Sequence, residues 1–132
     1  MPKKKPQFKI ESYGRYSAWK KGSRELPKIL EFTDVIKAVE GNEFGMILKI
    51  TGGRGIRLDY CIKHPPFRDA KGNIEPDFTG EYFVHSNQHE FYLGDCIWLP
   101  LEDKTGKWEI IVYFMGKEVA RKQFDVVLPE EL

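Results

Sequence analysis

The stretch GKWEIIVYFMGKEVARKQFDVV, residues 106–127, predicts two strands joined by a tight turn. From Trp108 to Phe114 bulky apolar residues recur at every second position, which is the period of a strand that buries one face. Met115-Gly116-Lys117 follows as a three-residue hairpin loop, because its glycine can adopt a positive φ. Apolar and polar residues then alternate again over residues 118–127. We therefore expect a β-hairpin that closes a sheet near the C-terminus.

Seven segments upstream of this hairpin are also expected to be strands. They span residues 8–16, 28–38, 43–51, 56–64, 81–85, 89–93 and 96–101, and turn residues separate them. Gly14 is expected to form a bulge in the first segment. Gly52-Gly53-Arg54-Gly55 predicts a direct hairpin between the third and fourth. The apolar residues of segment 28–38 would also fit a helical stripe, but its β-branched residues and the preceding Pro27 favour a strand, which is our interpretation.

This succession of short strands, with no helix between them, predicts an antiparallel β-sandwich of seven to nine strands. A barrel of the type that binds oligonucleotides is the alternative, although it usually needs fewer strands. The Gly-x-Trp at residues 106–108, followed by a hairpin that ends in Phe-x-Val, resembles the last two strands of immunoglobulin-like domains. Antibody domains have a tryptophan between two paired cysteines, whereas here Trp108 lies after both Cys61 and Cys96. The predicted fold class is all-β, an immunoglobulin-like β-sandwich.

The length of 132 residues suits one domain. We divide the chain into a basic tail over residues 1–7, a single β-sandwich domain over residues 8–128 and an acidic tail over residues 129–132. No apolar run has the length of a membrane span, and the basic N-terminus lacks the apolar region of a secretory signal. We therefore expect a cytoplasmic protein in which the two cysteines are reduced.

The net charge of +1 conceals an uneven distribution. Residues 1–28 carry nine Lys and Arg against two Glu, whereas the remaining residues carry 12 basic and 18 acidic side chains. A basic arm can bind an anionic partner, or it can lie against its own acidic body, which is our preferred interpretation. Nucleic-acid binding stays as the alternative, because basic residues of the arm alternate with Tyr13, Tyr16 and Trp19, a mixture that suits base stacking. The basic residues concerned are Lys9, Arg15, Lys20, Lys21 and Arg24.

Four motifs resemble a family of short bacterial proteins described only as a domain of unknown function. They are KIESYG at residues 9–14, LPKILEF at 26–32, HPPF at 64–67 and LGDCIW at 93–98. The resemblance extends from about Phe8 to Val127 and implies a bacterial single-domain protein. It implies no activity, no catalytic residues and no cofactor.

Metal binding is one hypothesis for the cysteines and histidines. Cys61 and His64 are three positions apart, and His85 and His89 are four apart. A zinc site needs about four converging ligands, and alternation along a strand points Cys61 away from His64. We therefore interpret these residues as a buried thiol and exposed imidazoles, and we expect no metal and no cofactor.

No nucleophile motif is present, so catalysis would need a site assembled from dispersed residues such as His64, His85 and Asp95. This enzyme hypothesis is the second alternative, and our expectation is that the chain is not an enzyme.

Protein or peptide recognition is the function that we favour. Trp19, Phe67 and Trp98 are candidate exposed aromatic residues, and rigid aromatic side chains on loops make good anchors. Together with His64 and His85 they form our set of candidate binding residues. A free sheet edge could also pair with a partner strand, and each aromatic residue could instead pack on the core. We expect a protein or peptide partner rather than nucleic acid or a membrane, and the oligomeric state stays open.

Overall fold

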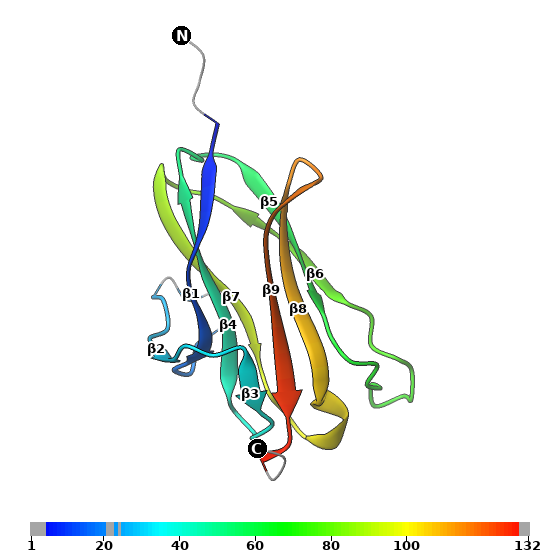
Figure 1. The fold of residues 1–132 in the computed structure, drawn as a ribbon. Helices are drawn as coiled ribbons and strands as arrows, with labels where there is room; N and C mark the ends of the chain where they lie inside the picture. Colours follow the sequence, from blue (N-terminus) through cyan, green and yellow to red (C-terminus); the bar gives the residue numbers. More distant parts are fainter. Residues whose placement is uncertain (1–4, 21–22, 24, 130–132) are drawn as a thin grey trace.

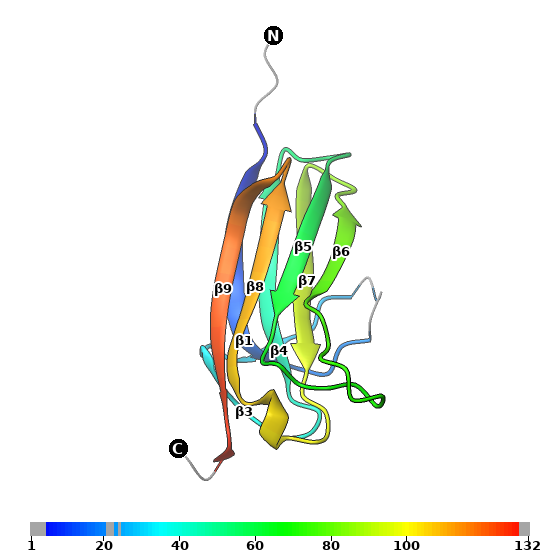
Figure 2. The same cartoon turned by 90° about the vertical axis from the view of Figure 1, so that its right-hand side faces the viewer.

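A computed structural model of the chain describes residues 5–20, 23 and 25–129. In this part of the chain nine strands form two sheets. Figures 1 and 2 show the two sheets packed against each other. The first sheet has the order β2-β1-β4-β7 and the second the order β3-β9-β8-β5-β6. The strands are β1 Gln7–Tyr16, β2 Ile29–Glu31, β3 Val35–Lys37, β4 Glu43–Thr51, β5 Arg57–Lys63, β6 Phe78–Phe83, β7 Gln88–Cys96, β8 Gly106–Phe114 and β9 Lys117–Val127. The predicted β-sandwich and its number of strands are confirmed.

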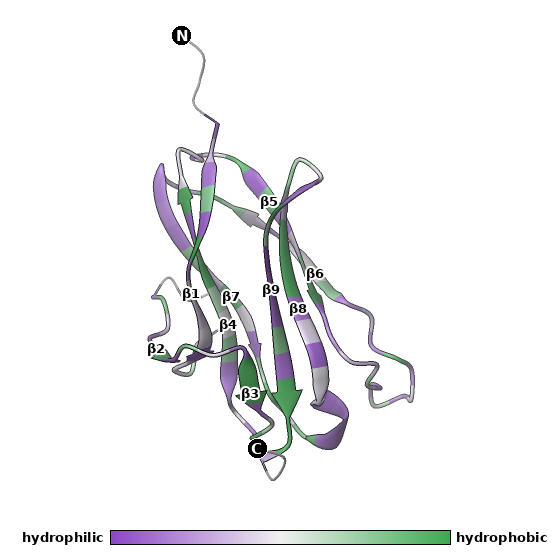
Figure 3. Ribbon diagram, viewed as in Figure 1, coloured by the Kyte–Doolittle hydropathy of each residue, from purple (hydrophilic) through white to green (hydrophobic). Residues whose placement is uncertain are grey.

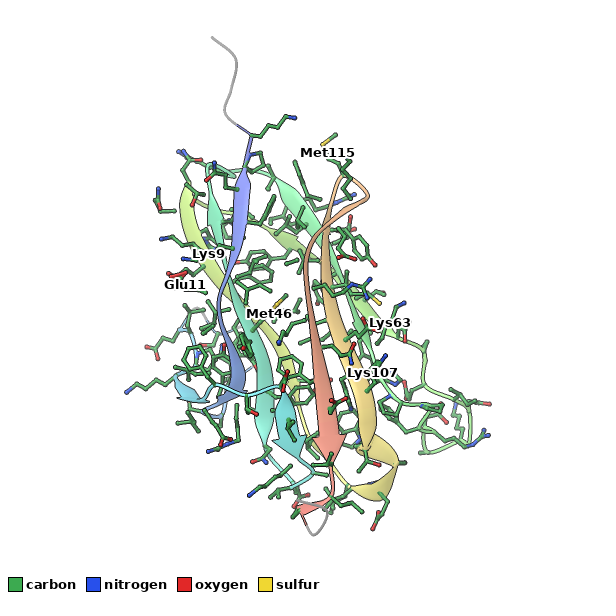
Figure 4. The ribbon with its side chains drawn as sticks, in the orientation of Figure 1. Lys9, Glu11, Met46, Lys63, Lys107 and Met115 are labelled. Atoms are coloured by element: carbon green, nitrogen blue, oxygen red, sulfur yellow. The ribbon has the colours of Figure 1, made fainter. Side chains whose placement is uncertain are left out.

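The core lies between the two sheets and is built from alternate residues of each strand. Figure 4 shows Met46 of β4 in this space, and its side chain has no exposed surface. Phe44 of the same strand meets Trp108 and Phe124 of the second sheet edge-to-face, with ring centroids 5.3 and 5.4 Å apart. Aromatic rings in this geometry stabilise a core beyond the area that they bury. The residues on which the fold prediction depended are therefore interior.

The C-terminal hairpin is confirmed, but its turn is shorter than predicted. β8 ends at Phe114 and β9 begins at Lys117, so Met115 and Gly116 alone form the turn, with φ angles of 51° and 78°. Two positive φ angles match the right-handed twist of the strands, as two-residue hairpin turns require. Lys117, the third residue of the predicted loop, belongs to β9 instead. The pairing of β8 with β9 contains a bulge at Val119, where the register shifts by one residue. Figure 4 shows Met115 at the tip.

Segment 28–38 is extended rather than helical, and it divides between the two sheets. β2 pairs with β1 in the first sheet, whereas β3 pairs with β9 in the second. The β3–β9 pair is parallel, with Val35 opposite Asp125. Figure 3 shows hydrophobic colour on β3 and on the adjacent end of β9. This crossover joins the two sheets along one side of the sandwich.

The predicted hairpin at Gly52-Gly53-Arg54-Gly55 is wrong, because β4 and β5 belong to different sheets. The turn carries the chain across the end of the sandwich. Its N–H groups bond to the connection between β6 and β7: that of Gly52 to the Asn87 carbonyl (2.8 Å), that of Arg54 to Asn87 Oδ1 (3.1 Å) and that of Gly55 to the Val84 carbonyl (2.8 Å).

Two boundaries upstream of the closing hairpin are also corrected. Segments 89–93 and 96–101 are not separate strands: β7 runs without a break through Gly94-Asp95 and ends at Cys96, so residues 97–101 form a loop. Gly94 lies opposite Gly45, and a Cβ atom at position 94 would overlap the carbonyl oxygen of Phe44. Glycine is thus required here for close packing within the sheet, not for a turn. Segment 81–85 begins earlier, as β6.

The bulge in the first strand lies at Glu11 rather than at Gly14. Ile10 pairs with Leu48 and Ser12 with Ile47, so the register shifts by one residue between them. The shift turns Tyr13 toward the core side, where Lys122 Nζ of β9 lies 3.9 Å from the centroid of its ring. This contact covers one open side of the sandwich. On the opposite side the Tyr82 ring of β6 stacks on Phe91 of β7, with centroids 4.1 Å apart.

Candidate functional site

Two loops meet at the end of the sandwich that lies opposite the β8–β9 turn. One loop connects β5 to β6, and the other connects β7 to β8 and contains the short 3₁₀ helix η1, Glu102–Lys104. Figures 1 and 2 show both at the same end of the molecule. Between them lies a cleft of about 450 Å³. It is lined by Phe67, Arg68, Asp69, Ala70, Glu75, Trp98, Leu99, Pro100 and Lys104.

The floor of the cleft is aromatic. The Phe67 ring meets the edge of Trp98, with centroids 5.2 Å apart, and His64 stacks on the other side at 4.1 Å with an interplanar angle of 21°. The Trp108 ring lies beneath, 6.0 Å from Phe67 and 6.3 Å from Trp98. The structure thus brings together three of the five candidate binding residues: His64, Phe67 and Trp98.

Our expectation that Phe67 is exposed is wrong, because its side chain is 2% exposed. The loop folds back on itself beyond this residue: Arg68 bridges to Ile74, and the Glu75 N–H donates to the Phe67 carbonyl at 2.9 Å. Asp69 Oδ1 accepts the N–H groups of Lys71 and Asn73, both at 2.9 Å. These bonds form a compact tip that presses the Phe67 ring inward. Trp98 is half-buried, so it is the aromatic residue that the cleft presents.

Lys104 is buried beneath the floor, with 1% of its surface exposed. Its Nζ donates to Asp103 Oδ1 at 2.6 Å and to the Pro100 carbonyl at 3.1 Å. The same nitrogen lies 4.7 Å from the ring centroids of both Phe67 and Trp98. A desolvated ammonium over two aromatic faces is attracted by each ring, by about 0.5–2 kcal/mol per contact. Lys104 therefore fastens the β7–β8 loop to the β5–β6 loop.

The end of η1 is held to the core by Trp108, whose Nε1 donates to the Lys104 carbonyl at 2.8 Å. Lysine is almost never fully buried unless it is paired, and here one carboxylate, one carbonyl and two rings are its partners. Because Asp103 is 39% exposed, the ion pair faces solvent on one side only. The loop that forms the second wall of the cleft is thus rigidly seated.

His64 holds the two ends of the β5–β6 loop together. Its Nδ1 lies 2.7 Å from the Pro65 carbonyl oxygen, and its Nε2 lies 2.8 Å from that of Pro76. The ring is half-buried between Phe67, Phe78 and Trp108, with centroids 4.1, 4.7 and 5.7 Å away. His64 therefore acts on the cleft through the loop and does not line it.

Trp19 lies elsewhere, on the outer face of the first sheet. Its ring meets Tyr92 of β7 with centroids 5.2 Å apart, and its Nε1 donates to the Glu25 carbonyl at 2.9 Å. Beneath these rings lies Glu43, a glutamate with 7% of its surface exposed, which accepts a hydrogen bond from Tyr92 Oη. Burial raises the pKa of Glu43 to about 7, and the nearby Asp95 adds to the increase, whereas the bonds from Tyr92 and the Trp19 backbone oppose it.

His85 is exposed beyond the end of β6, with its ring 6.0 Å from His89. His89 Nε2 bonds to Tyr82 Oη. Burial and then the nearby His85 lower the pKa of His89. His64 packs on Phe78 at the opposite end of β6, so the enzyme site that we considered from His64, His85 and Asp95 does not assemble. In the part of the chain that the structure describes, no three His, Cys, Asp or Glu residues are grouped to hold a metal ion.

The aromatic residues of the basic arm are engaged in packing. Tyr16 is 2% exposed and bonds to Ser12 across 2.7 Å, Tyr13 contacts Lys122, and Trp19 covers Tyr92. Each of these rings therefore already has a partner within the protein. Lys21 and Arg24, which we also assigned to this arm, lie outside the described residues.

Cys61 and Cys96 are free thiols on different sheets. Burial raises the pKa of each, and the carboxylates of Asp77 near Cys61 and of Glu43 near Cys96 raise it further. Neither thiol is therefore activated for nucleophilic attack.

Sequence reasoning missed Lys104, Glu43 and Tyr92. Lys104 lies in a charged turn, Glu-Asp-Lys-Thr, which is typical of a solvated loop. Glu43 and Tyr92 occupy the outward positions of their strands, and side chains from other segments, Tyr16 and Trp19 among them, cover this face. No local signal marks these residues, because contacts from distant segments bury them.

Two packed sheets, antiparallel except for the β3–β9 pair, define this chain as an immunoglobulin-like β-sandwich. Its fold is similar to that of an immunoglobulin-like protein from Pseudomonas aeruginosa, with a TM-score of 0.77 and 19% identity over 95% of this chain and 98% of the other. Residues 4–126 match the family described as Domain of unknown function (DUF3859). The chain belongs to that family, which confirms the resemblance seen in its motifs.

A more distant similarity is to the alkylpurine DNA glycosylase AlkC of Pseudomonas fluorescens, solved bound to DNA containing an abasic site analog. The TM-score is 0.44 and the identity 13%, over 70% of this chain and 27% of the other, which is too remote to bear on function. No curated protein matches the sequence. None of the helical structure in the described residues is long and apolar enough to cross a membrane.

Proposed function

We propose that this chain is a non-catalytic binding domain whose end cleft receives a segment of a protein partner. The observation that carries the proposal is the meeting of Phe67 and Trp98, from loops far apart in the sequence, beneath a cleft of about 450 Å³. Proteins commonly bind ligands in clefts of about 300–1,000 Å³ that are lined by apolar and aromatic residues with a few polar groups. Leu99, which is 57% exposed, extends the apolar surface at the rim.

The lining of the cleft favours a polypeptide segment over a strongly charged ligand. Arg68 contributes one positive charge at the rim, and Asp69 and Glu75 contribute two negative charges. The buried Lys104, in contrast, is paired with Asp103. A rim with so small a net charge does not attract a polyanion. A polypeptide segment fits this cleft in two ways. An apolar side chain of the segment would pack on the aromatic floor, and its polar but uncharged backbone would face the rim. The occupant that we propose is therefore an extended segment that inserts an apolar side chain against Trp98.

The bonding of the ionisable groups supports a binding role rather than a catalytic one. Lys104 is paired with Asp103, Asp69 accepts two backbone N–H groups, and both nitrogens of the nearby His64 face backbone carbonyl oxygens. These groups hold the loops in place. A general base or nucleophile needs to face the substrate with its reactive atom available.

The experiment is selection of a random peptide library on the wild-type chain, followed by affinity measurements with the enriched peptides. Ala70 lines the cleft and is exposed, so Ala70→Glu obstructs the cleft without disturbing the core. Ala18→Glu makes the same change at another exposed alanine, outside the cleft, and is the matched control. We expect Ala70→Glu to weaken binding by about tenfold or more and Ala18→Glu to leave it unchanged.

Binding in the cleft should also alter the emission of Trp98, and this change should be absent in Trp98→Phe. If no peptide is enriched, or if Ala70→Glu and Ala18→Glu bind the enriched peptides equally, the proposal is wrong.

A further inference from the structure

Both ring nitrogens of His64 face carbonyl oxygens, and this places a requirement on its charge. Nδ1 is 2.7 Å from the oxygen of Pro65, and Nε2 is 2.8 Å from the oxygen of Pro76. Carbonyl oxygens only accept hydrogen bonds, and neutral imidazole has one N–H, whereas the imidazolium ion has two. Both contacts are hydrogen bonds only when His64 carries the second proton.

The identity of the two partners strengthens this requirement. Both are prolines, which have no N–H group, so neither residue can offer a donor to an unprotonated ring nitrogen. In neutral His64 one lone pair would face a carbonyl lone pair at less than 3 Å. The repulsion would push one end of the loop away from the ring.

We propose that His64 is a proton-dependent clamp on the cleft: as imidazolium it ties residues 65 and 76 together, and when it loses the proton it releases one end of the loop that forms the Phe67–Glu75 wall. The inference rests on the proposed function in one respect, namely that the wall contacts the bound segment. Histidine is the side chain that ordinarily changes charge between about pH 5 and 8.

The surroundings of the ring suit a cation. Phe67 stacks on it at 4.1 Å, and the faces of Phe78 and Trp108 lie nearby. Aromatic faces attract a cation, and the two carbonyl dipoles stabilise it further. Within the described part of the chain the ring has no carboxylate partner. The elements around it carry the following charged and titratable residues: Arg57, Asp59, Tyr60, Cys61 and Lys63 of β5, Arg68, Asp69, Lys71, Glu75 and Asp77 of the loop, Glu81 and Tyr82 of β6, Glu102, Asp103 and Lys104 of η1, and Lys107, Glu109 and Tyr113 of β8.

Release at Pro76 would act on the cleft through a short path. The Glu75 N–H donates to the Phe67 carbonyl at 2.9 Å, and Phe67 and Glu75 both line the cleft. The residue bonded to His64 is thus the immediate neighbour of the residue that closes the loop. Loss of the clamp would leave the Arg68–Ile74 bridge intact and loosen the base of the wall.

The clamp is tested on the chain without any partner. The imidazole nitrogens of ¹⁵N-labelled protein are followed by NMR from about pH 5 to 8.5, with His64→Gln used to assign the signals. We expect both nitrogens of His64 to be protonated at the acid end. As the second proton leaves, the Glu75 amide should exchange about tenfold faster, after correction for the intrinsic effect of pH, while amides of β8 keep their protection.

His85→Gln is the matched control and should retain the step in Glu75 exchange, whereas His64→Gln should abolish it. If His64→Gln does not fold, the wild-type titration and the wild-type Glu75 exchange still decide the question. A single neutral tautomer of His64 over the whole range would overturn the clamp, and so would Glu75 exchange that stays constant while His64 titrates.

The link to binding is tested separately, with a peptide enriched on the cleft and measured at about pH 5.5 and pH 8. Weaker binding at the higher pH in wild type but not in His64→Gln supports regulation of the cleft, and equal affinities overturn it. If no peptide binds the cleft, the proposed function fails, while the titration and the exchange data continue to decide whether His64 is a clamp.

Discussion

The buried carboxyl of Glu43 gives the sharpest prediction about stability. The change that we consider is Glu43→Gln, which keeps the shape of the side chain and an oxygen that can accept the bond from Tyr92. It removes the negative charge that burial opposes. The matched control is Glu40→Gln, which removes a charge from an exposed glutamate just before the same strand.

The magnitude follows from the pKa of Glu43, which burial raises from an ordinary value of 4.5 to about 7. Because the folded state holds the proton more tightly than the unfolded state, folding takes up a proton between these two values. The stability that this proton provides is fully present below pH 4.5 and is lost as the pH rises through about 7. At about 1.4 kcal/mol for each unit of pKa, the total loss is about 3 kcal/mol.

The assay is the free energy of unfolding from urea titrations at intervals between pH 4 and pH 9. Subtracting the Glu43→Gln curve from the wild-type curve isolates the contribution of Glu43 from that of other titrating groups. We expect the variant to have wild-type stability to within about 1 kcal/mol near pH 4.5 and to be more stable by about 2–3 kcal/mol near pH 8. For a chain of this length that gain corresponds to a melting temperature higher by about 10 °C.

Glu40→Gln should give a curve parallel to that of wild type. If the Glu43→Gln curve is also parallel to the wild-type curve between pH 4.5 and 7, Glu43 does not titrate in the way that its burial requires. An Asp95→Asn variant gives a second check, because Asp95 raises the pKa of Glu43 and its neutralisation should make the loss smaller.

Three further predictions concern packing and reactivity. Gly94→Ala should lower the free energy of unfolding in urea by more than about 2 kcal/mol, because the new Cβ would overlap a backbone oxygen of β4. Gly116→Ala should lower it by only about 1 kcal/mol, because the space around Gly116 is open and only its φ of 78° is unfavourable for alanine. Phe67→Ala should lower stability by about 3–5 kcal/mol by differential scanning calorimetry, while Leu99→Ala, at the exposed rim, should change it by less than about 0.5 kcal/mol, and similar losses for the two would contradict the burial described. Cys96 should react with iodoacetamide more slowly than free glutathione at pH 8, because its pKa is raised; a faster reaction would show that the thiol is activated.

The inward faces of the strands could be predicted from the sequence because alternation depends only on local spacing. Residues 44, 46, 48 and 50 are all fully buried, and so are Trp108 and Phe124. Which strands pair could not be predicted in the same way, since alternation is identical whether the next strand lies in the same sheet or in the opposite one. The turn at residues 52–55 illustrates this, because its glycines suit a hairpin and a crossing between sheets equally well.

Two residues of the candidate site, Phe67 and Trp98, could be predicted from the sequence, but the exposure expected of Phe67 was wrong. The sequence predicts Phe67 and Trp98 as exposed aromatic residues, but they meet each other, and Phe67 is interior. Trp19, predicted on the same grounds, and the candidate binding residue His85 lie elsewhere. Lys104 could not have been found, because a lysine in a charged turn becomes interior only when rings from two distant loops close over it.

The parallel pairing of β3 with β9 has a consequence for how the protein is made. Val35 leaves the ribosome well before its partner Asp125, because the two residues lie far apart in the sequence. Contacts between such distant positions form slowly, because closing a long loop of chain costs conformational entropy before the contact stabilises it. Until β9 has been synthesised, the apolar residues of β3 have no strand beside them, so the nascent chain depends on β9 for protection against aggregation.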